Sequence, residues 1–197
     1  MDSDLQKWNY KIHLAREAEW WRYFGEYAWI VDLVFKNAQE SEVTVIARPQ
    51  LFLIRHTLEL GYKANIIELE KVSGLTTSLK FHSKQAHSLK SLHTDFERHF
   101  LEIATKFDLP KQILAEYKEL DKKATALKDL LHKFDQGSYA FRYPVATDGM
   151  TPHFDKNSTL NMSEVRKMYD SALVVLKYTT DVIAEHLSAR QSNTNSS

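Results

Sequence analysis

The sequence predicts an all-α protein, built as an antiparallel helical bundle of about five long helices. The 197 residues include only 5 Gly and 4 Pro, which argues against a loop-rich or all-β protein. Apolar residues recur at helical spacing through most of the chain. All connections between these periodic segments are short except one, and short connections place consecutive helices antiparallel.

The first expected helix begins after Asp2 or Ser3, which are both good N-caps, and ends near Asn37. It is unusually rich in aromatic residues. Its adjacent Trp20 and Trp21 cannot easily both face the interior, so we expect one of them at a dimer interface.

The second expected helix spans residues 43–71, after a polar break over residues 37–42. Pro49 falls inside it and predicts a kink or a restart. A segment with Gly and a Ser/Thr cluster follows as a loop. The third helix then runs from about residue 83 to residue 107.

The fourth expected helix is preceded by Asp108 as a cap, with Pro110 in its first turn, and ends near residue 134. Residues 135–161 then form the one long connection, with two Gly and two Pro. Connections of that length without regular structure are usually either functional or mobile.

The last expected helix opens with a capping-box pattern, Asn161 followed by Glu164. The chain ends in a polar segment, residues 189–197, which has nothing to bury and is expected to be disordered. The sequence therefore predicts a single helical domain over residues 1–188.

Composition narrows the class of protein. The chain is 43% hydrophobic and carries no net charge, so it can build a core and shows no sign of a large basic surface. It has no cysteine, which excludes disulfides and thiolate chemistry. It has neither an apolar signal core nor the run of roughly 20 apolar residues that a membrane helix needs. We expect a cytoplasmic protein without a membrane partner.

A polar stripe interrupts the mostly apolar second helix. Arg55, Glu59 and Lys63 are four residues apart and share one helix face, with His56 at its edge. Apolar residues such as Phe52 surround them, and charges beside packed apolar surface are costly unless they are paired. Glu59 is placed to pair with both Arg55 and Lys63. The stripe is either a ladder of ion pairs on the surface or a half-buried polar site between helices.

Two other segments carry residues that suit such a site. His87 lies at the start of the third helix, and Arg142 and Tyr143 lie in the sequence FRYP of the long connection. An arginine in an extended segment before Pro can bind Glu59 bidentately, through two of its nitrogens, or hold a phosphate. Behind the stripe, the small residue Gly61 would let another helix approach closely.

The segments RHTLELGYKANI, HSLKSL and FRYP, in this order before a final helix, resemble the HEPN superfamily of small prokaryotic helical bundles. The similarity spans about residues 48–187. It implies a HEPN-like fold and a component of a phage-defence or toxin–antitoxin system, which commonly pairs as a homodimer and can have a cognate partner protein. It also implies a site that binds or cleaves RNA, or binds a nucleotide.

Within that resemblance, we expect Arg142, His87 and Arg55 as candidate catalytic residues. The expected binding residues are Glu59, His56, Lys63 and Tyr143. Arginine holds a phosphate, and histidine can move protons near neutral pH. The alternative is a non-catalytic interaction module, in which the same residues form a buried structural network.

One departure from the family leaves the catalytic question open. Ribonuclease members carry an arginine, four to six residues and then a histidine in a late helix. Here Arg142 is followed by no histidine until His153, and the spacing from Arg48 to His56 is one residue too long and lies in the wrong helix. A metal-independent ribonuclease therefore remains an open expectation.

Nine histidines also invite a metal hypothesis, but none belongs to a complete ligand motif. His93 and His99 each have an acidic residue at helical spacing, and we interpret both as polar surface. No Gly-rich phosphate loop is present. The sequence predicts no metal site and no cofactor.

Overall fold

The protein is an all-α helical bundle, as the sequence predicts. The structure is a computed structural model that describes residue 11 and residues 19–81 and 83–194. Five α-helices occupy these ranges, together with the short 3-10 helices η1 (Glu40–Glu42) and η2 (Lys84–His87). The α-helices are α2 (Trp20–Asn37), α3 (Val43–Ser73), α4 (Leu89–Lys106), α5 (Lys111–Phe134) and α6 (Met162–Thr194). The described ranges contain no strand, only an isolated antiparallel bridge between Val145 and Pro152.

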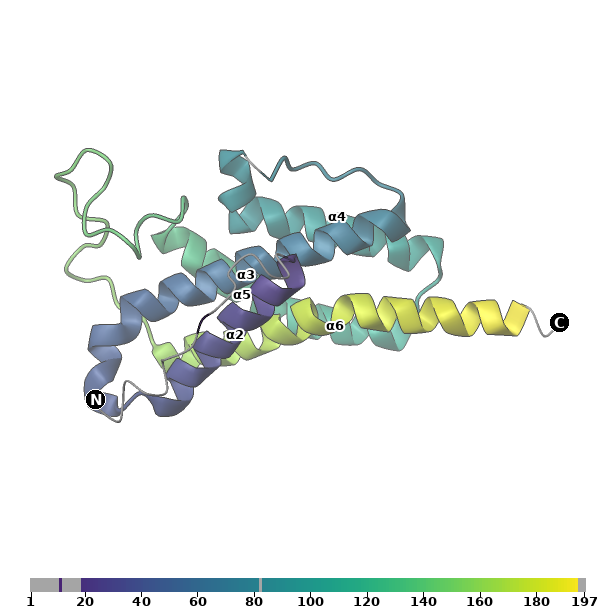
Figure 1. Ribbon diagram of the computed structural model, residues 1–197, viewed down its shortest axis with the longest axis horizontal. Coiled ribbons are helices and arrows are strands. Elements are labelled where there is room, and N and C mark those ends of the chain that lie inside the picture. Colours follow the sequence, from purple (N-terminus) through teal and green to yellow (C-terminus); the bar gives the residue numbers. More distant parts are fainter. Residues whose placement is uncertain (1–10, 12–18, 82, 195–197) are drawn as a thin grey trace.

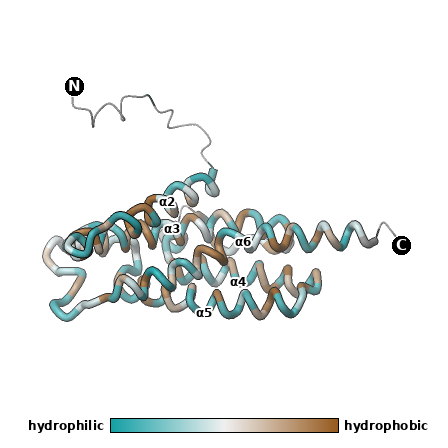
Figure 2. Tube along the Cα trace, turned by 90° about the horizontal axis from the view of Figure 1, so that it is seen from below, coloured by the Kyte–Doolittle hydropathy of each residue, from teal (hydrophilic) through white to brown (hydrophobic). Residues whose placement is uncertain are grey.

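Helix α3 is the centre of the arrangement. It packs against α2, α4 and α6, while α5 packs along α6 (Figure 1). The long connection 135–161 lies at one end of the bundle, and α6 extends past the other helices at the opposite end (Figure 2). None of the helices in the described ranges combines the length and the apolarity that crossing a membrane requires.

Because α3 has neighbours on several sides, its middle has no solvated face. Every residue from Thr57 to Ile66 is buried, including the charged Glu59 and Lys63. Close packing explains Gly61, where an added Cβ would lie 2.8 Å from Phe24 and 2.9 Å from Leu176. The predicted close helix approach is therefore confirmed.

The predicted boundaries are right for some helices and wrong for others. The restart at Pro49 is wrong, because α3 continues through it. Pro49 and Val45 are both exposed, so water can pair with the Val45 carbonyl that Pro49 leaves without an intrahelical donor. The third helix begins later than predicted: residues 84–87 form η2, and α4 starts after Ser88, whose Oγ accepts from the Ser91 N–H.

Of the N-caps predicted for the last two helices, one is wrong and one is confirmed. Asp108 does not cap α5; it has a φ of 51°, and Pro110 occupies the N-cap position. Asn161 does cap α6, since its Oδ1 accepts from the backbone N–H groups of Ser163 and Glu164 at 3.0 and 3.2 Å.

The predicted disordered tail is helical as far as Thr194. Arg190 donates to the carbonyl oxygen of Phe107, so this part of α6 is held against the end of α4 rather than left without contacts. The rest of the predicted tail, and the predicted start of the first helix at Asp2 or Ser3, lie outside the described residues.

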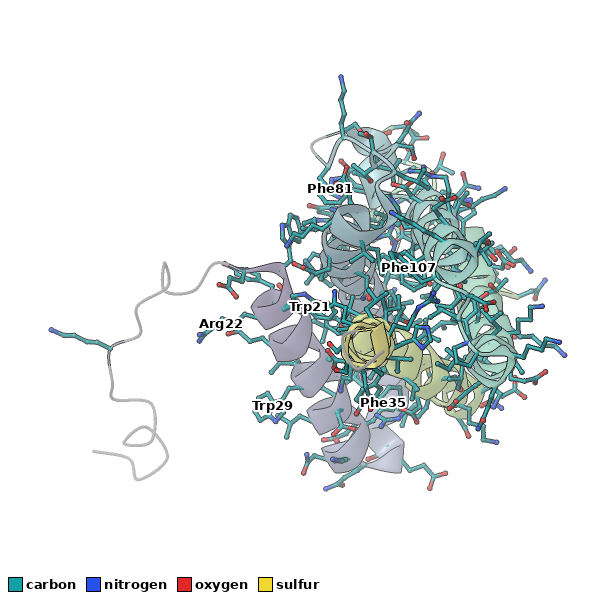
Figure 3. The ribbon with its side chains drawn as sticks, turned by 90° about the vertical axis from the view of Figure 1, so that its right-hand side faces the viewer. Trp21, Arg22, Trp29, Phe35, Phe81 and Phe107 are labelled. Carbon is teal, nitrogen blue, oxygen red and sulfur yellow. The ribbon has the colours of Figure 1, made fainter. Side chains whose placement is uncertain are left out.

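The aromatic residues of α2 divide between two sides of the helix. Trp21 packs against the core, whereas Trp20 contacts Phe81 edge-on at 5.7 Å. Trp29 projects from the outer side of α2 and is 62% exposed (Figure 3).

Candidate functional site

The polar stripe of α3 forms a buried chain of ion pairs. Arg55 Nη1 lies 3.2 Å from Glu59 Oε2, and Lys63 Nζ lies 2.8 Å from Glu59 Oε1. The three side chains are only 1–4% exposed. The predicted pairing of Glu59 with both cations is confirmed, and the interpretation as a ladder on the surface is wrong, because α2, α4 and α6 surround this helix.

Arg55 uses its remaining donors on two other segments. Its Nη2 donates to the carbonyl oxygen of His87, just before α4. Its Nε donates to the carbonyl oxygen of Asp135 at 3.3 Å and lies 3.5 Å from that residue's Oδ2. Arg55 therefore joins α3 to the beginning of α4 and to the end of α5.

Asp135 is the member of this network that sequence reasoning missed. Its Oδ1 accepts the backbone N–H groups of Tyr139 and Ala140 at 2.7 and 3.1 Å, which fixes the first turn of the long connection. The only sequence signal was an aspartate directly after a helix, and that pattern is equally typical of an ordinary turn.

His87 is the member of the network that reaches solvent. Its Nδ1 lies 2.8 Å from Glu59 Oε1, and its side chain is 50% exposed. Because a carboxylate only accepts, Nδ1 carries the proton in this contact. The other ring nitrogen makes no hydrogen bond with any residue that the structure describes, so it is available to a ligand.

The Glu59 network consists of Arg55, Glu59, Lys63, His87 and Asp135. Burial alone would raise the pKa of Glu59, but the hydrogen bond and charge of Lys63 and the charges of His87 and Arg55 outweigh it, so this pKa is lowered. Burial lowers the pKa of Arg55, against the opposing charges of Asp135 and Glu59. Two carboxylates thus face two cations, which leaves no excess positive charge for a phosphate.

Lys63 closes the network on the side of α2. Its Nζ lies 5.5 Å from the ring centroid of Trp20 and 5.8 Å from that of Phe81. Both ring faces favour a cation. The ammonium group is therefore enclosed by one carboxylate and two aromatic rings.

Arg142 lies at the surface beside this network. Its Nε donates to the carbonyl oxygen of Ser138 at 2.6 Å. The expected bond to Glu59 is absent, because Arg55, Lys63 and His87 already occupy the oxygens of Glu59. The prediction that Arg142 reaches Glu59 is therefore wrong. The long connection is joined to the network through Asp135 instead, which contacts Arg55.

Aromatic rings surround the guanidinium of Arg142 instead. Its Cζ lies 5.4 Å from the ring centroid of Phe52, 5.2 Å from that of Tyr139 and 5.5 Å from that of Tyr143. Tyr139 and Tyr143 are 50% and 51% exposed. Tyr139 did not figure among the predicted site residues, although its spacing of four from Tyr143 was visible in the sequence.

His56 extends this aromatic group inward. Its ring stacks on Phe52 at 5.8 Å and meets Tyr27 edge-on at 4.6 Å. Burial lowers its pKa, so the ring is held neutral between its neighbours. The Arg142 cluster consists of Arg142, Tyr139, Tyr143, Phe52 and His56.

The sequence suggested that the histidines of α4 lie on a polar surface. They are instead buried and connect α4 to α5 and α3. His93 Nε2 lies 2.9 Å from Asp121 Oδ1 on α5, and His99 Nδ1 lies 2.8 Å from Ser73 Oγ on α3. These two residues are 5% and 0% exposed. In the part of the chain that the structure describes, no group of three or more His, Asp or Glu residues is placed to hold a metal ion.

Comparisons with family models, with curated proteins and with solved structures find no match to this chain.

Proposed function

We propose that this protein is a HEPN-like component of a prokaryotic defence or toxin–antitoxin system, and that it binds single-stranded RNA or a nucleotide at the Arg142 cluster. One observation carries the proposal. An exposed guanidinium lies between two half-exposed tyrosines and gives only its Nε to the protein. Its other nitrogens make no hydrogen bond with the described residues, so they remain available for a phosphate.

The chemistry of the cluster suits a single-stranded nucleic acid. Single-stranded bases stack on aromatic side chains and on guanidinium planes, at about 1–3 kcal/mol per base, and arginine binds the backbone phosphate. The cluster offers both kinds of group within one turn of the chain, since Arg142 lies between Tyr139 and Tyr143 in sequence and contacts both rings.

The Glu59 network supports this surface rather than acting on the ligand. The donors of Arg55 point to Glu59, Asp135 and His87, and Asp135 holds the turn that carries Tyr139. This is the structural role that the alternative interpretation gave to these residues. It favours binding over cleavage. His87 is the one network member that reaches solvent, and it is the candidate for proton transfer if RNA is cleaved.

Fluorescence anisotropy with a labelled single-stranded RNA of mixed sequence, and with labelled ATP, tests the proposal. We expect Arg142→Ala to weaken RNA binding about tenfold or more, because it removes both a phosphate contact and the centre of the stack. Arg22→Ala is the matched control, since it removes the same charge from an exposed ion pair with Glu26 on α2. Equal losses in the two variants would show a non-specific charge effect and contradict the proposal.

Expression in cells separates cleavage from binding. Induction of the wild type and of the Arg142→Ala and His87→Ala variants is scored for growth and for total RNA integrity. If wild type cleaves RNA on its own, growth stops and RNA is degraded, and both variants relieve the effect. Intact RNA and normal growth with wild type would contradict a standalone ribonuclease and leave the binding role, in which a partner protein or a phage supplies the trigger.

The family resemblance also supports a homodimer. Trp29 and Tyr23, on the exposed side of α2, are 62% and 41% exposed, which is more aromatic surface than a lone helix face requires. Sedimentation velocity over a range of concentrations tests this. A protein that stays monomeric at the highest concentration would contradict it.

A further inference from the structure

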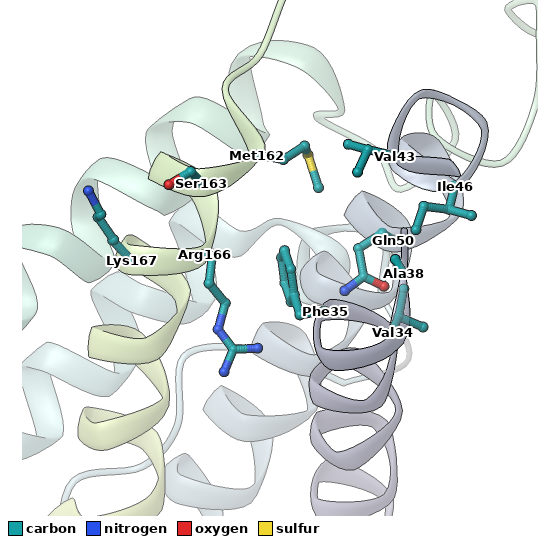
Figure 4. A pocket seen from close by; sticks show the side chains of 10 residues that line it. All are labelled: Val34, Phe35, Ala38, Val43, Ile46, Gln50, Met162, Ser163, Arg166 and Lys167. Atoms are coloured by element: carbon teal, nitrogen blue, oxygen red, sulfur yellow. The ribbon is translucent and has the colours of Figure 1, made fainter. Parts of the chain in front are cut away.

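A cavity lies where the end of α2, the start of α3 and the start of α6 meet, on the part of α3 that precedes Arg55 (Figure 4). It has a volume of about 350 Å³, at the lower end of the roughly 300–1,000 Å³ typical of small-molecule sites. It shares no residue with the Arg142 cluster. Its apolar walls are Val34, Phe35, Ala38, Val43, Ile46 and Met162.

Gln50 gives this apolar cavity a specific polar group. Gln50 is 2% exposed, and its Nε2 donates to the carbonyl oxygen of Val31 at 2.9 Å. Its Oε1 is buried and accepts no hydrogen bond from the described residues. Since buried polar atoms are normally paired, an unpaired acceptor on a residue that lines a cavity points to a ligand that donates to it.

Arg166 provides a donor at the same cavity. Its Nη2 donates to Asp32 at 2.8 Å and its Nε to Asp170 at 2.9 Å, while its guanidinium lies over the ring of Phe35 at 4.8 Å. Its Nη1 is buried and has no partner among the described residues. Two carboxylates therefore fix the guanidinium of Arg166, and its third nitrogen, Nη1, can still donate to a further acceptor.

The rim of the cavity adds positive charge. Lys167 is exposed, lines the cavity and makes no ion pair with any residue in the described ranges. Ser163 lines it from the first turn of α6, where the helix dipole favours an anion. Asp32 and Asp170 are matched in charge by Arg166 and Lys36, so the excess positive charge at this rim comes from Lys167.

We propose that this cavity binds a small amphipathic carboxylate that carries a hydroxyl group. The hydrocarbon body fills the apolar walls, the carboxylate lies against Arg166 Nη1 and Lys167, and the hydroxyl donates to Gln50 Oε1. The cavity volume suits a medium-length chain. The inference does not depend on the function proposed for the Arg142 cluster.

Four probes test the three parts of the proposal: 2-hydroxyoctanoate, octanoate, octan-1-ol and 2-hydroxybutyrate, all below micellar concentration. Binding is followed by calorimetry and by the Met162 methyl resonance in protein labelled on methionine methyl groups. We expect saturable binding of 2-hydroxyoctanoate with a shift of Met162. Octanoate should bind about tenfold more weakly because it cannot donate to Gln50, and the other two should not saturate.

Two variants locate the binding. Lys167→Ala is expected to weaken 2-hydroxyoctanoate about tenfold, whereas Lys118→Ala, an exposed lysine on α5, should leave it unchanged. Gln50→Leu should abolish the preference for the hydroxyl group, so that 2-hydroxyoctanoate and octanoate bind equally. Circular dichroism confirms that each variant is folded.

The outcomes that overturn the proposal are distinct. If no probe saturates or shifts Met162, the cavity is not a site for this class. If octan-1-ol binds as well as 2-hydroxyoctanoate, the cavity takes apolar molecules without regard to charge. If Lys167→Ala and Lys118→Ala have equal effects, the binding is elsewhere.

Discussion

Arg55 and Arg142 are two arginines on neighbouring parts of the molecule, and their surroundings differ in every respect. Arg55 lies in the middle of α3, is 1% exposed and bonds to Glu59, Asp135 and His87. Arg142 lies in the long connection, is exposed and gives only Nε to the carbonyl oxygen of Ser138. One guanidinium is enclosed by carboxylate and carbonyl oxygens, the other by aromatic rings.

The difference follows from the cost of burying charge. A buried cation must be matched by carboxylates and hydrogen bonds, which leaves it nothing to offer a ligand. An exposed cation stays solvated and needs no partner, so rings can hold its position while its donors remain open. The Glu59 network is therefore interpreted as support, and the Arg142 cluster as the binding surface.

Removing Glu59 should have the largest effect on stability. Glu59→Ala leaves Lys63 buried without its carboxylate and Arg55 with one carboxylate fewer, so we expect the free energy of unfolding to fall by about 3–5 kcal/mol. Urea denaturation measures it. Glu68→Ala is the control on the same helix, because its ion pair with Lys71 is exposed and should be worth at most about 1 kcal/mol. Similar losses in the two variants would show that the Glu59 network stabilises the fold no more than an exposed ion pair does.

Asp135 belongs to both regions, and its removal should affect both. Asp135→Ala takes a carboxylate from Arg55 and frees the N–H groups of Tyr139 and Ala140, so we expect a loss of about 1–3 kcal/mol in unfolding free energy. RNA affinity should fall as well, since the turn carrying Tyr139 is no longer fixed. Asp148→Ala, which alters a turn in an exposed part of the same connection, should leave RNA affinity unchanged. Full RNA affinity in Asp135→Ala would show that the two regions are independent.

Arg142→Ala should separate the two regions most clearly. It removes a bond to one carbonyl oxygen and cation–π contacts at the surface, but no buried ion pair, so the unfolding free energy should change by only about 1 kcal/mol. RNA affinity should nevertheless fall about tenfold. A loss of several kcal/mol in urea denaturation, with RNA affinity unchanged, would assign Arg142 to the structural network instead.

The sequence alone was enough to predict the all-α bundle, because apolar periodicity and scarce Gly and Pro are local signals. Boundaries that depend on contacts between elements were not predictable in the same way. The helix that reaches Thr194 is an example, since Arg190 is held by a carbonyl oxygen on a distant segment, Phe107. The φ of 51° at Asp108, which removes it as a cap, is another.

For the candidate site, the spacing of four residues was sufficient to predict that Glu59 pairs with Arg55 and Lys63. His87, at the start of the third helix, was expected to take part in the same polar site, and the structure places it against Glu59. Spacing could not show that the oxygens of Glu59 would be fully occupied, which is what displaces Arg142. Asp135 was missed because its role depends on where α5 ends relative to α3, which no local pattern encodes.

Acidification should distinguish the Glu59 network from the Arg142 cluster, by a smaller change in unfolding free energy than the substitutions above. The pKa of Glu59 is lowered in the folded protein, because the contacts of Lys63, His87 and Arg55 outweigh burial. A carboxyl group whose pKa is lowered by folding stabilises the protein above its unfolded pKa, and that contribution is lost as the pH falls through the folded pKa. The unfolding free energy of the wild type should therefore fall between about pH 5 and pH 3.

Glu59→Gln isolates the contribution of Glu59, because Asp32 and Asp95, whose pKa values are also lowered, remain in both proteins. The variant should start from a lower stability at pH 6 and lose less on acidification, so the two curves converge. Arg142→Ala should instead run parallel to the wild type, since its guanidinium makes no bond to a buried carboxylate. Urea midpoints measured at intervals of pH in all three proteins give the comparison. Parallel curves for wild type and Glu59→Gln would show that Glu59 is not held ionised by the network.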